Sequence, residues 1–439
     1  MKIKDFSAGD SVEIVTDSAT VKGIVMPNET ENIVIKLDSG YNFGIERKKI
    51  KSIKLLEKHT EAKEEKKEKV KSKKDLKNIT ILHTGGTIAS KVDYTTGGVV
   101  SRFEPHEIIE MFPELRDIFN VDSRLIGNMW SEDMRFIHFQ KIAKEIIKEI
   151  KNKKDGVIVT LGTDFMAYAS AAVSFMLQNI PIPVIFVGAQ RSSDRGSSDA
   201  AMNLICAAEF IRQTNFTGHA ICMHETQDDI NCLILHPCTS RKMHSSRRDA
   251  FRPINNSAIA RVNYEKRTVN FIDEKYENKK KSDGKFSPKI NMEEKVALIK
   301  VHPNMFPEQF KAFKGYKGLV IEGSGLGHAP VGVPDKDSKK NEDNFKEIKK
   351  LIKSGTVVIM ATQTIYGAVQ MHVYAKGRDL VSAGIIPCKA LAETSLIKLS
   401  WLIANFSKEM KDHEKAKELI EKDFCGEMFY RIEDQNYLN

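Results

Sequence analysis

The chain lacks most of the features that mark membrane, secreted and metal-binding proteins. It has six cysteines among 439 residues and no Cys-x-x-Cys pair, which favours neither a disulfide framework nor a zinc site. No apolar run is long enough to span a bilayer, and the N-terminus has no apolar signal core. No internal repeat, Walker motif or dinucleotide-binding motif is present. These absences predict a soluble cytoplasmic protein with reduced thiols, no metal in this chain and no membrane contact.

The composition is that of an ordinary globular protein, with 41% hydrophobic residues, 26 Gly and 13 Pro. A chain of 439 residues can bury two or three cores. The formal net charge of +9 comes mostly from lysine, and much of the excess lies in a few charged runs. Such runs are by themselves a weak argument for nucleic-acid binding.

Residues 1–56 differ from the rest of the chain. Short β-branched runs at 12–15, 21–25 and 33–37 and a further expected strand at 41–45 alternate with turn residues. Four or five short strands without helices predict a small all-β barrel of the SH3-like type. Residues 57–77 are almost entirely charged and cannot bury an apolar face. We expect a charged linker there, either as a plain tether or as a solvated helix.

From residue 78 onward, strands and helices alternate, which predicts parallel α/β sheets with crossover helices. Residues 78–272 are expected to form the first of two such domains, which contains the active site. Its expected strands are 78–83, 121–126, 156–160, 183–187 and 219–223, and its expected helices are 136–150, 166–177 and 200–210.

A charged, turn-rich segment at 273–294 predicts a connection to a second α/β domain at 295–439. Strands are expected at 296–301, 318–321 and 356–360, helices at 345–352 and 391–404, and a charged surface loop at 335–341. The predicted fold class is therefore α/β, with two parallel-sheet lobes preceded by a small all-β barrel.

A glycine-rich turn, Thr84-Gly85-Gly86-Thr87, follows the first predicted strand of the α/β region. Ligands bind at the carboxyl ends of strands in open parallel sheets. Gly85 and Gly86 allow the backbone to approach a ligand closely and to present N–H donors. Thr87 is then a candidate nucleophile, with its hydroxyl directed at a carbonyl carbon. The alternatives are a tight turn and a phosphate cradle, neither of which needs a nucleophile.

Thr163 and Asp164 follow another buried strand, where a helix is expected to begin. Asp164 suits a simple N-cap or first-turn position of that helix. A catalytic role needs a third group, because a Thr hydroxyl is a poor acid and something must accept its proton. Lys242 is a candidate acceptor if burial or nearby positive charge disfavours its ammonium form. As one lysine in a basic segment, it also fits a plain surface charge.

The segment Ser131-Glu132-Asp133 offers groups that suit an amino-acid substrate. Asp133 can accept a hydrogen bond from an α-ammonium group, and Ser131 with backbone N–H groups can hold an α-carboxylate. A helix cap with two acidic residues in its first turn is the alternative.

In order and approximate spacing, these segments resemble the motifs of the L-asparaginase family of amidohydrolases, from about residue 78 to 404. The resemblance implies an asparaginase-like fold and a reaction that hydrolyses a side-chain amide. It implies Thr87 as the nucleophile, and Thr163, Asp164 and Lys242 as a proton relay. Which of the two threonines initiates the attack stays open.

The same resemblance implies that Ser131 and Asp133 bind substrate and that Tyr94, in a mobile loop, closes over it. The chain departs from the family at one motif. Leu161 and Phe165 flank the Gly-Thr-Asp segment, where the family usually has His and Thr. The catalytic pair is retained, but the outer part of the pocket is expected to differ.

A narrower resemblance is to the D subunits of archaeal glutamyl-tRNA(Gln) amidotransferases. It rests on residues 187–195 and 236–253 and on the N-terminal barrel, which free asparaginases lack. It implies a homodimeric glutaminase that supplies ammonia to a partner, the amidotransferase E subunit, within a heterotetramer. The partner binds tRNA(Gln), uses ATP and Mg to phosphorylate the misattached glutamate, and completes the amidation.

The interpretation is thus a cytoplasmic glutaminase subunit that supplies ammonia for converting Glu-tRNA(Gln) to Gln-tRNA(Gln), with no cofactor of its own. The barrel and the basic residues Arg247 and Arg248 are candidate contacts for the partner or for tRNA. Two alternatives remain: a free cytoplasmic L-asparaginase, and an RNA-binding protein on an inactive enzyme scaffold. The preference between glutamine and asparagine and the route of ammonia also stay open.

Overall fold

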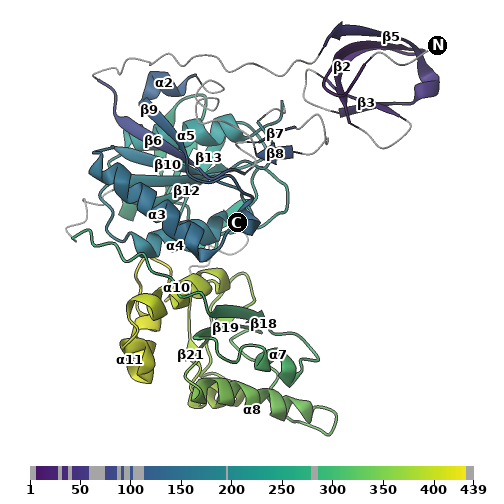
Figure 1. Ribbon diagram of the computed structural model, residues 1–439. Helices are drawn as coiled ribbons and strands as arrows, with labels where there is room; N and C mark the ends of the chain where they lie inside the picture. The colour runs from purple at the N-terminus through teal and green to yellow at the C-terminus, as the bar shows by residue number, and fades with distance from the viewer. Residues whose placement is uncertain are drawn as a thin grey trace.

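The computed structural model shows a small β domain and two α/β domains (Figure 1). The described residues are 6–27, 32–37, 42–58, 75–86, 90–92, 99–101, 113–193, 196–277 and 285–431. Thr87, Tyr94 and residues 59–74 of the expected linker lie outside the described residues.

The N-terminal part is all-β, as predicted. Its strands form one antiparallel sheet in the order β4-β3-β2-β1-β5. The strands are β1 (Ser11–Thr16), β2 (Thr20–Met26), β3 (Ile33–Lys36), β4 (Asn42–Ile45) and β5 (Ile50–Glu57), with a 3₁₀ turn η1 (Arg47–Lys49) before β5. Val12, Ile14 and Ile35 are fully buried in its core. Strand β5 was not located from the sequence.

The first α/β domain is built on an eight-stranded sheet within the described residues, in the order β17-β16-β13-β12-β11-β10-β6-β9. The strands are β6 (Asn78–His83), β9 (Asn120–Leu125), β10 (Gly156–Thr160), β11 (Pro183–Val187), β12 (Gly218–His224), β13 (Asn231–Leu235), β16 (Ala260–Asn263) and β17 (Thr268–Phe271). The strands from β12 to β9 in this order are parallel, as predicted. Strands β13, β16 and β17 extend the sheet in antiparallel fashion, which the sequence did not predict.

Helices cover both faces of this sheet (Figure 1). They are α2 (Leu115–Ile118), α3 (Phe136–Lys151), α4 (Met166–Met176), α5 (Ala200–Gln213) and α6 (Glu274–Glu277). Residues of α3 and α4 pack into one apolar core, and residues of α2 and α5 pack into the other. Two small hairpins lie outside the sheet: β7 (Ser90–Val92) with β8 (Val99–Ser101), and β14 (Ser240–Lys242) with β15 (Phe251–Pro253).

The C-terminal domain has a parallel sheet in the order β18-β19-β20-β21. Its elements are β18 (Val296–Lys300), α7 (Pro307–Lys311), β19 (Gly318–Gly323), α8 (Lys340–Lys353), β20 (Val357–Thr362), α9 (Ala375–Ser382), β21 (Ile386–Pro387), α10 (Ala392–Asn405), η5 (Glu409–Lys411) and α11 (His413–Glu421). Helix α8 begins inside the segment that was expected to be a charged loop. The predicted fold class is confirmed.

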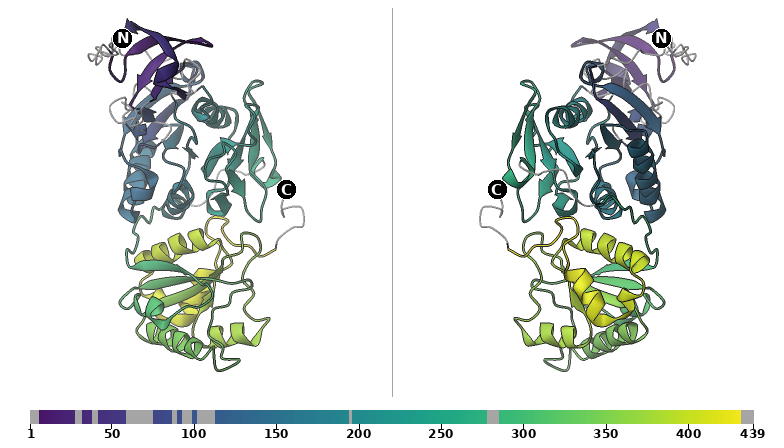
Figure 2. Two further views of the ribbon diagram at one scale, coloured as in Figure 1. Left: turned by 90° about the vertical axis from the view of Figure 1, so that its right-hand side faces the viewer. Right: turned by 90° about the vertical axis from the view of Figure 1, so that its left-hand side faces the viewer.

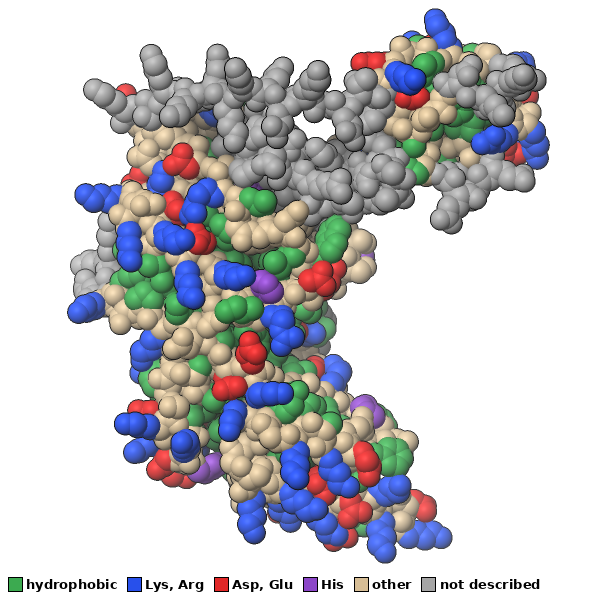
Figure 3. Space-filling model, in the orientation of Figure 1, with side chains coloured by type: hydrophobic (Ala, Val, Ile, Leu, Met, Phe, Trp, Pro, Cys, Tyr) green, Lys and Arg blue, Asp and Glu red, His purple; other side chains and the backbone are tan. Residues whose placement is uncertain are grey.

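The two α/β domains meet where α10 packs against α4 (Figures 1 and 2). A buried ion pair fixes the last described segment to α10, with Lys398 Nζ 2.7 Å from Glu427 Oε1 and both side chains fully buried. On the face in Figure 3, Lys and Arg side chains are interspersed with Asp and Glu. Among the described residues, no helix is both long and apolar enough to cross a membrane.

Candidate active site

The glycine-rich turn lies at the carboxyl end of β6, directly against the carboxyl end of β10. Thr84 N–H donates to Thr160 O at 3.0 Å, which continues the pairing of the two strands. Gly85 and Gly86 have φ angles of +100° and +82°, a conformation that favours glycine. A Cβ on Gly86 would lie only 2.3 Å from the nitrogen of Gly162, so glycine is required for this close approach.

Three of the predicted residues meet at this edge of the sheet. Lys242 Nζ donates to Thr163 Oγ1 at 2.9 Å and to Asp164 Oδ1 at 2.8 Å. Thr163 and Asp164 follow β10, whereas Lys242 is the last residue of β14. Thr163 is 5% exposed, and the Lys242 side chain is 13% exposed. The sequence-based grouping of these three residues is therefore matched by direct contacts.

These contacts decide between the alternatives that the sequence left open for the positions of Asp164 and Lys242. Helix α4 has Phe165 at its N-cap position without a side-chain cap, and the Asp164 carboxylate pairs with Lys242 instead. Lys242 is not a plain surface charge, because it is mostly buried and contacts two polar groups. The ammonium is thus held between a hydroxyl and a carboxylate.

Ser131 belongs to the same site, and Asp133 lies next to it. Both are in the 3₁₀ turn η3 (Ser131–Asp133), in which Ser131 is fully buried and Asp133 is exposed. Ser131 Oγ accepts from the N–H of Phe165 at 3.3 Å, which connects η3 to the Thr163 segment. The turn does not cap α3, whose N-cap is Arg135. Asp133 is thus exposed to solvent in the same turn as Ser131.

Two glycines that sequence analysis did not single out for this role create the space for these side chains. A Cβ on Gly162 would lie 2.8 Å from Ser131 Oγ, and one on Gly188 would lie 2.7 Å from Thr163 Cγ2. Each distance is well below normal contact, so a larger residue would displace Ser131 or Thr163. Their signal in the sequence is a glycine within two residues of the end of a buried strand, at the edge where ligands bind.

His83 is a further residue that the sequence did not indicate as important. It ends β6, is 1% exposed, and its Nδ1 and Nε2 lie 2.7 Å from Thr160 Oγ1 and from Ser123 Oγ, respectively. Burial lowers the pKa of His83 to about 4, so the ring is neutral at pH 7. His83 joins β6 to both neighbouring strands directly before the glycine-rich turn.

The hairpin that carries Lys242 is held by ion pairs. Arg241 Nε lies 3.0 Å from Glu393 Oε1 in the first turn of α10, which connects the hairpin to the C-terminal domain. The buried carboxylate of Asp249 pairs with Arg247 and Arg252. Arg248 pairs with the carboxylate of Asp229, and its side chain is 13% exposed. Its guanidinium is therefore less available to a partner or tRNA than the sequence suggested.

The arrangement suits proton transfer to and from a hydroxyl. Lys242 Nζ lies 2.9 Å from Thr163 Oγ1, so this amine, once it has given up its own proton, is within reach of the hydroxyl proton, and Asp164 orients it. Among the described residues, no group of three His, Cys, Asp or Glu side chains is placed to hold a metal ion. Thr87 and Tyr94 lie outside the described residues, so their roles stay predictions.

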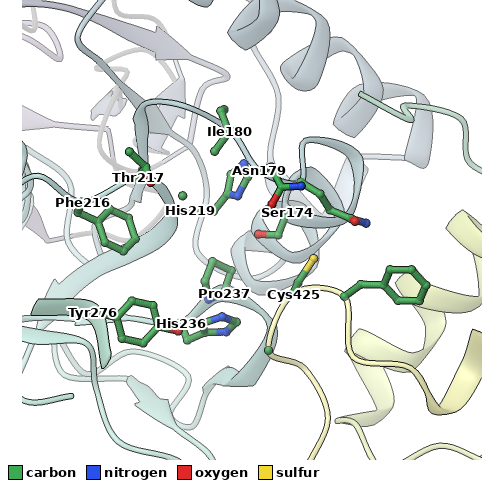
Figure 4. Close-up of a pocket in the computed structure, with 14 residues that line it drawn as sticks. Ser174, Asn179, Ile180, Phe216, Thr217, His219, His236, Pro237, Tyr276 and Cys425 are labelled. Atoms are coloured by element: carbon green, nitrogen blue, oxygen red, sulfur yellow. The ribbon is translucent and has the colours of Figure 1, made fainter. Parts of the chain in front are cut away.

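A cavity of about 270 Å³ lies at the opposite edge of the sheet (Figure 4). Gly218 at the amino end of β12 lines it, as do His236 and Cys425. The glycine-rich turn and the Thr163–Asp164 segment follow the carboxyl ends of β6 and β10, and β12 runs parallel to those strands. This cavity is therefore separate from the candidate active site.

The fold and this cluster of Thr, Asp and Lys define an amidohydrolase of the asparaginase type. The family model "Asparaginase, N-terminal" matches residues 78–276, and "Glutaminase/Asparaginase C-terminal domain" matches residues 295–419. A solved structure of the thermostable L-asparaginase from Thermococcus kodakarensis is similar, with a TM-score of 0.69 and 27% identity. That similarity covers 80% of this chain and 99% of the asparaginase.

The N-terminal part narrows the assignment, because "GatD N-terminal domain" matches residues 6–56. The chain is 42% identical to the D subunit of the glutamyl-tRNA(Gln) amidotransferase of Pyrococcus furiosus, over 98% of this chain and 96% of the relative. It is 41% identical to the D subunit from Methanococcus maripaludis, over 96% of this chain and 97% of the relative. The chain therefore belongs to the family of glutamyl-tRNA(Gln) amidotransferase D subunits.

Proposed function

We propose that this chain is the glutaminase subunit of a tRNA-dependent amidotransferase. It hydrolyses L-glutamine with water to glutamate and ammonia, and the ammonia serves to convert Glu-tRNA(Gln) to Gln-tRNA(Gln). The observation that carries this proposal is the contact of Lys242 with both Thr163 and Asp164, in a chain 42% identical to an amidotransferase D subunit over 98% of its length.

In the proposed mechanism, Asp133 and Ser131 hold the α-ammonium and α-carboxylate groups of glutamine, and Tyr94 closes over the bound substrate. Thr87 attacks the side-chain amide carbon, and backbone N–H groups of the glycine-rich turn stabilise the oxyanion. Ammonia leaves, and water hydrolyses the acyl-enzyme on Thr87 to release glutamate.

The proton relay supports both steps of this mechanism. Lys242, oriented by Asp164, takes the proton of Thr163, which in turn activates the nucleophile or the attacking water. The short distances from Lys242 to its two partners support this role, because proton transfer needs groups within hydrogen-bond reach.

The proposal includes partners. We expect a homodimer of this chain with one amidotransferase E subunit per protomer, acting in the cytoplasm. The E subunit would bind tRNA(Gln) and use ATP and Mg, so that this chain needs no cofactor. The names of the relatives, which are subunits, support a multi-subunit complex, and the N-terminal domain is a candidate contact to the partner.

A free L-asparaginase is the second candidate, because a solved L-asparaginase matches 80% of this chain. The N-terminal domain and the identity to D subunits favour the amidotransferase. An RNA-binding protein on an inactive scaffold is disfavoured by the contacts among Lys242, Thr163 and Asp164.

The test is ammonia release from glutamine and from asparagine, with and without the E subunit and Glu-tRNA(Gln). We expect glutamine hydrolysis to rise well above that of the isolated chain when the partner and the acylated tRNA are added. Thr87→Ala should lose at least three orders of magnitude in turnover but still bind the partner. Equal turnover with and without the complex, with asparagine preferred, would favour the free asparaginase.

A further inference from the structure

Lys242 lies in a β-hairpin that is too short to be stable by itself. Strands β14 and β15 pair over three residues each, and Lys242 lies opposite Phe251. An isolated two-stranded hairpin is marginally stable in water. The residues that connect the two strands, 243–250, are exposed except at their C-terminal end. Groups outside the two strands must therefore fix the hairpin.

Asp249 lies at that end and is the centre of such a set of contacts. Its carboxylate accepts from Arg247 Nε at 2.8 Å and from Arg247 Nη2 at 2.9 Å, a bidentate pair. Arg252 Nη2 donates to it at 2.7 Å, and the amide of Gln227 donates as well. The Asp249 side chain is only 3% exposed. Hydrogen bonds between charged groups are stronger than neutral ones, and the arginines hold the pKa of the Asp249 carboxyl well below its usual range.

The partners of Asp249 come from three segments that must stay together. Arg252 is in the middle of β15, and its Nη1 also donates to Glu225 O at 2.6 Å, directly after β12. Gln227 lies in the same connection between β12 and β13, so the carboxylate attaches the hairpin to the main sheet. The ladder also continues past Lys242, since Met243 N–H donates to Ala250 O at 2.7 Å.

We propose that Asp249 is a positioning residue, which holds the hairpin so that the Lys242 ammonium stays against Thr163 and Asp164. Asp249 does not touch the reacting atoms. It acts through the β14–β15 hairpin: its removal breaks the link to Gln227 and leaves Arg252 with its bond to Glu225 O but without the carboxylate that orients its guanidinium. The inference rests on the proposed function, because the position of Lys242 limits turnover only if Lys242 takes part in the reaction.

The chain offers a matched control at a neighbouring carboxylate. Glu225 begins the same connection between β12 and β13, and its carboxylate accepts from Arg261 Nε at 2.8 Å and from Arg261 Nη2 at 2.5 Å. Its side chain is 17% exposed. Arg261 lies in β16 and not in the hairpin or its connecting residues, so Glu225→Gln removes the same charge and a bidentate arginine pair without releasing the hairpin.

The experiment uses the full chain in complex with its partner and has two readouts. The first is kcat and KM for glutamine hydrolysis. The second is the rate at which acetic anhydride acetylates Lys242, measured by mass spectrometry relative to the exposed Lys350. A purely structural role elsewhere in the chain would not change the second ratio.

In Asp249→Asn we expect kcat to fall on the order of 10²-fold, because a displacement of about 1 Å at a catalytic group has that effect. KM should stay within about threefold, since the substrate-binding groups are on other elements. Acetylation of Lys242 should rise several-fold over that of Lys350. Glu225→Gln should match the wild type, and Asp249→Glu, which keeps the carboxylate, should recover about tenfold of the lost kcat.

Three results would overturn the inference: wild-type kcat in Asp249→Asn, an equal loss in Glu225→Gln, or a loss of kcat without faster acetylation of Lys242. If Asp249→Asn does not fold, Gln227→Ala decides, because it removes the link between Asp249 and the connection after β12: a folded Gln227→Ala with wild-type kcat and unchanged Lys242 acetylation contradicts the proposal. Lys242→Met distinguishes a failure of the proposed proton relay from a failure of the positioning role of Asp249. Full turnover in Lys242→Met refutes the proposed relay, whereas an inactive Lys242→Met with a fully active Asp249→Asn refutes only the positioning role.

Discussion

Replacing Gly188 with alanine should move the Thr163 hydroxyl away from Lys242. Gly188 follows β11, and a Cβ at this position would lie 2.7 Å from Thr163 Cγ2 and 3.2 Å from Leu161 O. Carbon atoms in contact are normally about 3.5–4.0 Å apart. The added methyl group must therefore displace the Thr163 methyl by roughly 1 Å. Thr163 can yield by rotating about χ1 or by shifting with its backbone, and both movements carry Oγ1 with them.

The size of the effect follows from the Thr163–Lys242 contact. Its length of 2.9 Å would increase beyond hydrogen-bonding range after a displacement of about 1 Å. Misplacing a reacting group by about 1 Å costs on the order of 10²-fold in rate. This corresponds to about 2.7 kcal/mol in the activation free energy. Overpacking should also lower the free energy of unfolding by about 1–3 kcal/mol, which leaves a domain of this size folded.

The assay is kcat for ammonia release from glutamine, with a thermal melt to show that each variant is folded. Gly127→Ala is the matched control at the same edge of the sheet. A Cβ on Gly127 would lie 3.5 Å from Met129 Cε and 3.8 Å from Thr84 Cα, which are ordinary contacts. A wild-type kcat in Gly188→Ala would show that the position of the Thr163 hydroxyl does not limit the reaction. A comparable loss in Gly127→Ala would show that the effect is not specific to Thr163.

Three further perturbations have definite expected results. Burial lowers the pKa of His83 to about 4, so below pH 6.5 the unfolded chain binds a proton that the folded chain does not. Between pH 7 and pH 5 the contribution of His83 to the free energy of unfolding should fall by roughly 2 kcal/mol. Urea unfolding of His83→Gln should therefore show a weaker pH dependence than that of the wild type. Lys242→Met and Asp164→Asn should each nearly abolish turnover and be non-additive in a double-mutant cycle, whereas additive losses would separate the two residues. Lys398→Met leaves the Glu427 carboxylate buried without its ion-pair partner. The free energy of unfolding, measured with urea, should fall by about 3–5 kcal/mol, and a decrease below about 1 kcal/mol would contradict this.

Much of the fold could be predicted because buried parallel strands are continuous apolar runs. The strand Gly156–Thr160 is fully buried at every position, and its observed limits equal the predicted ones. Strand β5 (Ile50–Glu57) is mostly exposed and has no clear alternation, so the sequence gives no period to detect. Helix α8 starts with mostly exposed, polar and charged residues. Without an apolar pattern there, the sequence predicted a loop where the first turn of the helix lies.

Part of the candidate site could be predicted because its polar residues directly follow buried strands that are visible in the sequence. Thr163 and Asp164 follow a strand visible in the sequence, and the structure brings Lys242, 78 positions from Asp164, into contact with both. The hairpin that makes this contact has three-residue strands without an apolar pattern, and its ion pairs depend on tertiary pairing. The role of Asp249 could therefore not be read from the sequence.

The central claim is that Lys242 acts with Thr163 and Asp164 to hydrolyse the amide of glutamine. The most direct test is steady-state ammonia release from glutamine by the assembled complex with Glu-tRNA(Gln), comparing the wild type with Lys242→Met. We predict a loss of at least three orders of magnitude in kcat, with complex assembly unchanged. A folded Lys242→Met complex whose kcat stays within about tenfold of the wild type would contradict the claim.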